Sequence, residues 1–317
     1  MAQHEMTRRG FLAAATLAVA SARGVRLRAQ TPDPPPPPDV VQVSSEFVVR
    51  GRRIHQAVLP EMLDEALRQV TGRPAAAEAW RSLLRTDDVI GLKCNRSAAA
   101  GLGTGDAFAS AVISSLLAAG FDRRQIVAIE VGDAIYKEND VARPARGWLS
   151  TPSSFASGTD HLSAVLDQVT AIVNIPFLKT HNIAGITCCL KNLSHGLIKH
   201  PARYHESHCS PYIADIVALP RIREKLRLNL VNALRVVFDQ GPEARDDFTW
   251  DAGILLASRD PLAADTVGLD IINSEREILG LGAVDAVERR TVHLEAAAER
   301  GLGKGDLHDI ELRTRRL

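Results

Sequence analysis

The chain has 317 residues, enough for one large α/β domain or two small ones. Hydrophobic residues make up 45% of it and charged residues 24%, which excludes a wholly disordered, collagen-like or fibrous protein. Lys plus Arg and Asp plus Glu number 38 each, so there is no basic excess, and only 4% of the residues are aromatic. Both features argue against a nucleic-acid partner. Four cysteines without a CxxC pair are too few for a disulfide scaffold and do not favour a cysteine-only cluster site.

The N-terminal sequence has the features of an export signal. Thr7-Arg8-Arg9-Gly10-Phe11-Leu12 precedes an apolar run over residues 13–20, and this order is similar to the bacterial twin-arginine consensus. The run is shorter than the roughly 20 apolar residues that span a bilayer, so we expect no stable membrane span in the mature chain. We therefore expect a signal peptide over residues 1–29, the twin-arginine export machinery as a partner, and a periplasmic or secreted protein. An ordinary N-terminal anchor helix is the alternative.

Five consecutive prolines, Pro34 to Pro38, follow the signal. Such a run can neither pair within a sheet nor continue a helix, and it adopts an extended conformation. We therefore expect a linker over residues 30–45 and a single α/β domain over residues 46–317.

Within the domain, short apolar runs alternate with stretches of helical periodicity. The apolar positions between Leu59 and Val70, for example, have the spacing of one helical face. We expect Asp106 to cap a helix and Gly120 to end it. In chain order, the expected elements are strand 47–49, helix 59–70, strand 88–93, helix 106–119, strand 126–131, helix 161–169, strand 171–175, helix 211–226, strands 228–231, 236–238 and 253–257, helices 261–272 and 284–300, and strand 309–312. This alternation predicts an α/β fold whose mainly parallel sheet has helices on both faces.

Ligands in such folds bind outside the carboxyl ends of the strands. The segments that follow expected strands are 93–95, 132–133, 177–181, 239–242 and 258–260. Lys179 and His181 lie in one of them, and Lys191 comes shortly after. Two lysines and an imidazole can hold a carboxylate or a phosphate, and His181 can alternatively act as a general base or a metal ligand. Surface lysines beside a histidine that caps a loop would be the non-functional explanation.

Five segments resemble the family called domain of unknown function 362. They are Val89–Asn95, Asn174–His181, Gly185–Leu193, Asp239–Pro242 and Asp260–Asp265, and they follow the family's order over residues 46–275. The strand-end positions and the resemblance together predict one pocket that gathers catalytic residues (His181, Lys179, Lys191) and ligand-binding residues (Lys93, Asn95, Asp133, Asn192, Asp260, Asp265). We expect acidic partners for the lysines among Asp133, Asp260 and Asp265, or a bound anion. Two positions depart from the family pattern, because Cys94 replaces a usual proline and Asn232 a common aspartate. The ferredoxin-like cysteine motif that many relatives carry is absent from this chain.

A second cluster holds residues that suit a transition metal. His195, His200, His205, His208 and Cys209 lie close together in the sequence. Imidazole and thiolate bind zinc, copper or iron, although the spacing is not that of a helical zinc motif. A solvated, mildly basic loop is the alternative.

These observations support two functional hypotheses. The first is an exported enzyme that acts on an anionic small molecule with a metal or another cofactor loaded before export, redox chemistry being favoured. The second is a non-catalytic protein that binds the same class of anion through the same lysines. The identity of the cofactor does not follow from the sequence, although a transition metal is compatible with it.

Overall fold

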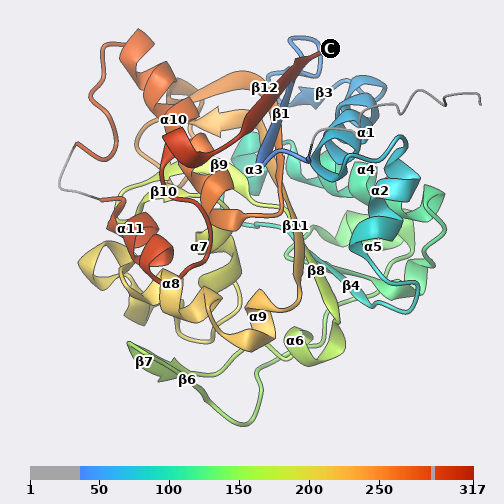
Figure 1. Ribbon diagram of the computed structural model, residues 1–317, viewed down its shortest axis with the longest axis horizontal. Helices are drawn as coiled ribbons and strands as arrows, with labels where there is room; N and C mark the ends of the chain where they lie inside the picture. The colour runs from blue at the N-terminus through green and yellow to red at the C-terminus, as the bar shows by residue number, and fades with distance from the viewer. Residues whose placement is uncertain (1–35, 287–289) are drawn as a thin grey trace, which may run out of the picture. The chain divides into compact units, whose positions relative to one another are not determined.

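A nine-stranded sheet forms the centre of the molecule (Figure 1). The computed structural model describes residues 36–286 and 290–317, which belong to one compact unit. The strand order is β13-β1-β12-β11-β8-β4-β5, and the β9–β10 hairpin joins the sheet beside β11. These strands are β1 (Val40–Ser44), β4 (Ile90–Lys93), β5 (Ile126–Ile129), β8 (Ala171–Asn174), β9 (Phe177–His181), β10 (Gly185–Thr187), β11 (Leu226–Val237), β12 (Thr249–Ser258) and β13 (Leu312–Arg316). Two small hairpins lie apart, β2 (Val49–Arg50) with β3 (Arg53–Ile54) and β6 (Ser153–Phe155) with β7 (Gly158–Asp160).

The sheet is mixed but mostly parallel, which confirms the predicted fold class. β4 is parallel to β5 and β8, β11 is parallel to β8 and β9, and β1 is parallel to β13. β12 is antiparallel to its neighbours β1 and β11, and β10 is antiparallel to β9. β5 lies at the edge of the sheet, but helices cover both of its faces, which explains why Ile126–Ile129 is apolar and buried at every position.

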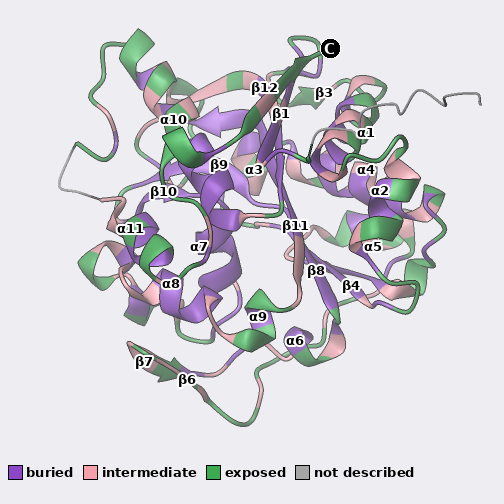
Figure 2. Ribbon diagram, viewed as in Figure 1, coloured by how far each residue is buried: buried purple, intermediate pink, exposed green. Residues whose placement is uncertain are grey.

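Helices cover both faces of the sheet, so the core has two layers (Figure 2). The packing follows from the alternation of strand side chains: Ile126 and Ala128 face one layer, and Val127 and Ile129 face the other. On the first face pack α1 (Val58–Thr71), α2 (Ala76–Leu83), α4 (Gly105–Ala118) and α5 (Asp133–Asn139), and on the second α6 (Val165–Gln168), α7 (Cys189–Ser194), α8 (Tyr212–Val217), α9 (Pro220–Arg223), α10 (Pro261–Ile278) and α11 (Val292–Glu299). The short α3 (Ala99–Leu102) lies between β4 and α4 in the chain.

The expected linker boundary at residue 45 is wrong. Val40–Ser44 forms β1, which pairs with β12 on one side and β13 on the other. Its apolar residues Val40, Val41 and Val43 are fully buried, so this segment belongs to the folded core. The expected signal peptide over residues 1–29 lies outside the described residues. No helix within the described residues is long and apolar enough to cross a membrane.

Several elements differ in length from their expected bounds. The helix expected at 161–169 is only α6, and the helix expected at 211–226 is split into α8 and α9, because Pro220 starts a new helix. The strands expected at 228–231 and 236–238 are one continuous strand, β11. Of the helix expected at 284–300, only α11 forms among the described residues. Asp106 lies in the first turn of α4, whose cap position is Thr104.

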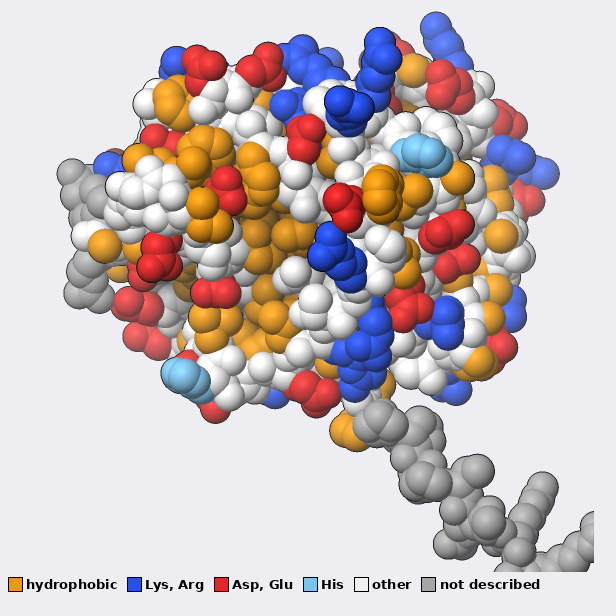
Figure 3. Space-filling model, turned by 90° about the horizontal axis from the view of Figure 1, so that it is seen from above, with side chains coloured by type: hydrophobic (Ala, Val, Ile, Leu, Met, Phe, Trp, Pro, Cys, Tyr) orange, Lys and Arg blue, Asp and Glu red, His pale blue; other side chains and the backbone are white. Residues whose placement is uncertain are grey.

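The end of the molecule that is uppermost in Figure 1 presents apolar surface between charged groups. Seen from that end, hydrophobic side chains gather in a hollow, with lysine, arginine and acidic side chains around it (Figure 3). Ile278 at the end of α10 is 78% exposed and is one of the large hydrophobic residues at the surface.

Candidate functional site

Lys179 and His181 lie on a strand rather than in the expected loop. The chain leaves β8 at Ile175 and Pro176 and re-enters the sheet as β9, which pairs with the second half of β11. In β9, Lys179 and His181 are two residues apart and therefore point to the same side of the strand. Thr187 of β10 is the register partner of Lys179, so its side chain points to that side as well.

Lys191 lies on α7, a six-residue helix whose N-terminus is capped by a residue distant in sequence. The Asp265 carboxylate of α10 accepts hydrogen bonds from the amides of Cys189 at 2.6 Å and Leu190 at 3.1 Å. Burial raises the pKa of Asp265 to about 6, an increase that the two amide bonds partly offset. A helix this short is marginal in isolation, so this tertiary cap contributes to its formation. His195, at the C-terminal cap of α7, lies one turn beyond Lys191.

These side chains meet in a cavity of about 280 Å³, which we call the lysine cavity. It lies beyond the carboxyl ends of β4 and β5 and beside the β9–β10 hairpin, as expected for a ligand site of this fold. Its lining residues are Asn95, Ser97, Glu130, Lys179, His181, Thr187, Lys191, Asn192, His195, Gly196, Pro201, His205 and Pro242.

The two cavity lysines are buried without an acidic partner. Lys179 is 1% exposed, and its Nζ donates to the carbonyl oxygen of Ser97 at 2.9 Å and to Ser97 Oγ at 3.0 Å. Lys191 is 7% exposed, and its Nζ lies 3.3 Å from Nε2 of His205. Neither makes an ion pair with a carboxylate of residues 36–286 or 290–317. Burial lowers the pKa of each lysine to about 8, with a nearby charge on Glu243 opposing the change for Lys179.

His181 is held as a neutral imidazole. Its Nδ1 accepts hydrogen bonds from the amides of Ile183 at 3.1 Å and Ala184 at 3.2 Å, which assigns the ring proton to Nε2. Burial, and next the positive charge of Lys191, lowers the pKa of His181 to about 2. The ring also stacks on His205, with centroids 5.6 Å apart. His181 can therefore donate a hydrogen bond through Nε2 but is not charged at neutral pH.

Lys93 and Asn192 form the base of the cavity. Lys93 is fully buried, and its Nζ donates to Asn192 Oδ1 and to the Cys94 carbonyl, both at 2.8 Å, and pairs with Glu130 at 3.3 Å. Asn192 Nδ2 donates in turn to the Lys93 carbonyl and to Asn174 Oδ1. Lys93 is thus neutralised by Glu130 and supports the site rather than facing the cavity.

Two buried polar atoms on the cavity wall have no hydrogen-bond partner in the part of the chain that the structure describes. Thr187 is 4% exposed, and its Oγ1 is buried without a hydrogen bond; Asn95 Oδ1 is in the same state, although Asn95 Nδ2 lies 3.3 Å from Asn192 Oδ1. Buried polar atoms in native proteins are nearly always hydrogen-bonded, so such atoms in a cavity indicate a place for a ligand or water.

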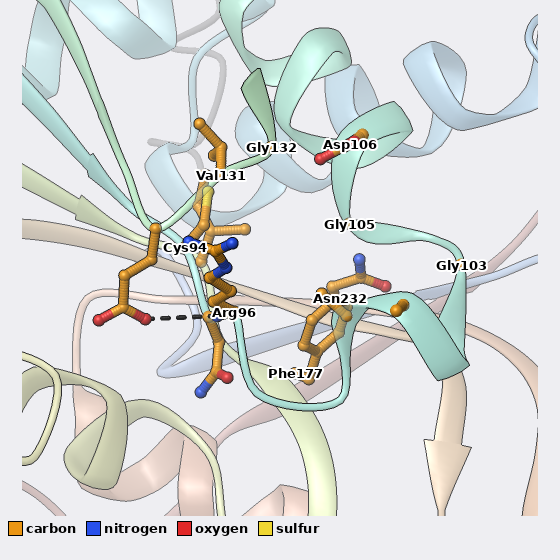
Figure 4. A pocket seen from close by; sticks show the side chains of 14 residues that line it. Cys94, Arg96, Gly103, Gly105, Asp106, Val131, Gly132, Phe177 and Asn232 are labelled. Atoms are coloured by element: carbon orange, nitrogen blue, oxygen red, sulfur yellow. Dashed lines mark hydrogen bonds between the residues drawn. The ribbon is translucent and has the colours of Figure 1, made fainter. Parts of the chain in front are cut away.

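A second pocket of about 360 Å³ shares Asn95 and Glu130 with the lysine cavity. Figure 4 shows Phe177 and Asn232, which are register partners on β9 and β11, on its wall. The dashed bond in that view runs from the amide of Arg96 to the Glu130 carboxylate at 3.3 Å. Asn232 bonds to the side chain and carbonyl of Thr104 and so braces the segment before α4.

Three expected ligand-binding aspartates are not at the cavity. Asp133 is exposed and pairs with Arg143 at 2.9 Å, which lowers its pKa. Asp260 caps α10 through the Ala263 amide and also accepts from the Lys304 amide. Asp265 caps α7, as described above. The expectation that these carboxylates lie in one pocket with the lysines is therefore wrong for the lysine cavity, since none of the three lines it.

Of the five expected metal ligands, the structure brings three together. One ring nitrogen of His195, one of His205 and Sγ of Cys209 lie within 4.8 Å of one another. His200 instead pairs with Asp160 at 2.9 Å, and His208 Nδ1 lies 2.9 Å from the Ile183 carbonyl. A further group of ligand type, Cys188, Cys189 and Asp265, is fully buried, and both oxygens of its carboxylate already cap α7.

Sequence reasoning missed Glu130, Ser97 and Thr187. Glu130 was hidden inside the strand expected at 126–131, but β5 ends at Ile129, and the φ of +60° at Glu130 places it in the left-handed region that non-glycine residues rarely occupy. Ser97 and Thr187 reach the cavity through the β4–α3 segment and the hairpin register, neither of which follows from local sequence.

Comparison with known proteins gives one family match. Residues 144–270 match the family described as domain of unknown function (DUF362). No curated protein matches the chain. The matched range supplies Lys179, His181, Lys191 and the three clustered metal-type residues, whereas Lys93 and Asn95 lie before it. Much of the segment that builds the lysine cavity therefore lies within the range that is similar to this family.

Proposed function

We propose that this chain is an exported enzyme whose substrate is an anionic small molecule bound in the lysine cavity. The observation that carries the proposal is the pair Lys179 and Lys191, both buried, both facing one cavity, and both without a carboxylate partner among the described residues. A buried ammonium without a counter-charge is costly, and a bound anion would remove much of that cost.

The remaining groups of the cavity also suit an anion. His181 offers an N–H at Nε2, and Thr187 offers an unpartnered hydroxyl. Glu130, the acidic residue on the wall, is paired with Lys93 and so adds little uncompensated negative charge. Donors that converge from a strand, a hairpin partner and a helix can surround a carboxylate or phosphate group.

Catalysis rather than simple binding is favoured by the state of the lysines. Burial lowers the pKa of Lys179 and Lys191 to about 8, close enough to neutrality for an amine to give up and recover a proton. His181, whose pKa burial lowers to about 2, is assigned to hydrogen-bond donation instead. Groups with shifted pKa values gathered in one cavity are typical of active sites.

The experiment is a calorimetric titration of the mature chain with inorganic phosphate and with malonate. We expect one anion site, and at least a tenfold loss of affinity in Lys179→Met and Lys191→Met. Lys199→Met is the matched control, because Lys199 is exposed on the segment after α7. The proposal would be contradicted if neither phosphate nor malonate bound, or if Lys199→Met lost as much affinity as the two cavity variants. Binding without conversion of a panel of phosphate and carboxylate esters, followed by NMR, would leave the non-catalytic binder as the function.

A further inference from the structure

Three side chains that can bind a metal meet beside the lysine cavity. His195 caps α7, His205 separates two short 3-10 turns, and Cys209 ends the second of them. Their nearest ligand atoms lie within 4.8 Å of one another, and the two imidazole centroids are 4.7 Å apart. His195 and His205 line the cavity, whereas Cys209 is fully buried behind them. We call these residues the His–His–Cys group.

Hydrogen bonds fix both imidazoles in a ligand-ready state. His205 Nδ1 lies 3.0 Å from the Pro201 carbonyl, and His195 Nε2 lies 3.2 Å from the Tyr204 carbonyl. A carbonyl oxygen only accepts, so these nitrogens carry the ring protons, and Nε2 of His205 and Nδ1 of His195 keep a lone pair. Ser194 Oγ lies 3.1 Å from His195 Nδ1 and also donates to the Lys191 carbonyl, so this hydroxyl can leave the imidazole when a metal binds. A backbone carbonyl that orients an imidazole in this way is the usual second partner of a metal-bound histidine.

The backbone that carries Cys209 is held in an unfavourable conformation. Ser207, His208 and Cys209 have φ values of +49°, +58° and +63°. The left-handed region costs a non-glycine residue on the order of 1 kcal/mol or more, and three in succession are unusual. The Cys209 thiol makes no hydrogen bond within residues 36–286 and 290–317. The strained turn thus places an otherwise unused thiol against the two histidines.

From these observations we infer that the His–His–Cys group binds one divalent transition-metal ion of the zinc class. Two imidazole nitrogens and one thiolate suit Zn²⁺, and three protein ligands leave a fourth position for a small molecule. Ligand atoms around a tetrahedral zinc ion are separated by roughly 3.3–3.8 Å, so binding requires the group to close by about 1 Å. The fourth position would lie at the lysine cavity, because His195 and His205 are on its wall.

Lys191 links this ion to the anion site. Its Nζ lies 3.3 Å from Nε2 of His205, the nitrogen that retains a lone pair. An ammonium and a metal ion cannot share that lone pair, so the metal must displace Lys191 from His205 and leave it free to hold an anion. Metal and anion should therefore strengthen each other's binding, as linkage requires. This coupling rests on the proposed function, whereas the metal site itself does not.

The test is titration of metal-free mature chain with Co²⁺, which reports thiolate ligation through its sulfur-to-cobalt charge-transfer band. We expect one equivalent to bind with that band, Cys209→Ser to abolish the band, and His205→Gln, which alters a partly exposed ring, to weaken binding at least tenfold. Cys188→Ala is the matched control, because Cys188 is a buried cysteine of the separate Cys188–Cys189–Asp265 group and not of the His–His–Cys group. Its titration should be unchanged.

Failure of the metal site and failure of the anion site are separable. Lys179→Met should retain the cobalt band while losing phosphate affinity, because Lys179 does not contact the His–His–Cys group through any hydrogen bond of the described residues. No charge-transfer band in the wild-type chain, or a band that survives Cys209→Ser, would overturn the metal site. Phosphate affinity that is unchanged or reduced by Co²⁺ would overturn the coupling through Lys191.

Discussion

Replacing Lys179 with methionine should remove anion binding without destabilising the fold. The side chain is 1% exposed, and burial lowers its pKa from 10.5 to about 8. One pKa unit corresponds to about 1.36 kcal/mol, so at pH 7 the charged amine costs the ligand-free protein about 3 kcal/mol relative to the unfolded chain. Methionine keeps the apolar stem and removes this cost. We expect Lys179→Met to be as stable as the wild type or more stable by up to about 3 kcal/mol.

Lys93 provides the contrast. It is equally buried, but it pairs with Glu130 and donates to Asn192. Lys93→Met would leave these groups without their cation, and we expect a loss of about 3 kcal/mol in the free energy of unfolding.

Urea unfolding at pH 7 measures both stabilities, and calorimetric titration with phosphate measures the affinity of the Lys179 variant. The reasoning would be refuted if Lys179→Met lost more than about 1 kcal/mol of stability, the size of an ordinary net hydrogen bond. Lys179 would then be a structural residue held by Ser97 rather than a residue kept for a ligand.

The remaining predictions concern a helix cap, a close contact and the export signal. Burial raises the pKa of Asp265 from 3.8 to about 6, so the free energy of unfolding should fall by up to about 3 kcal/mol as the pH rises from 4 to 6. Asp265→Asn should lose this pH dependence. Urea titrations in which the variant keeps the pH dependence of the wild type would contradict the prediction. An alanine Cβ at Gly196 would lie 2.5 Å from Lys93 Nζ and 2.9 Å from the Asn192 carbonyl oxygen. We therefore expect Gly196→Ala to cost about 1–3 kcal/mol, whereas Gly282→Ala, with open space around it, should be neutral in the same unfolding assay. Replacing both Arg8 and Arg9 with lysine should retain the protein in the cytoplasm, and an unchanged periplasmic yield on fractionation would exclude the twin-arginine route.

Strong local patterns made much of the fold predictable. The helical periodicity of residues 59–70 became α1, and the helix expected from Pro261 became α10. β1 was missed, because its alternating valines follow a proline run that looked like the end of a linker. β9 was missed because Lys179 and His181 make it polar where a buried strand is expected to be apolar. In both cases the segment becomes a strand because it pairs with strands that are distant in the sequence.

The convergence of Lys179, His181 and Lys191 followed from a general property of parallel sheets, since strand ends meet at one edge. The acidic partners of these lysines could not be predicted from the sequence, because the same local sequence can place a carboxylate at a ligand site or at a helix cap. Asp265 shows the difference. It lies 75 residues from Leu190, and only the packing of α10 against α7 turns it from a candidate ligand into the cap that presents Lys191. Among the described residues, the cavity wall carries no acid other than the paired Glu130, and this is therefore a tertiary property. It is also what distinguishes an anion site from a network of structural ion pairs, because the same lysines beside free carboxylates would already be neutralised.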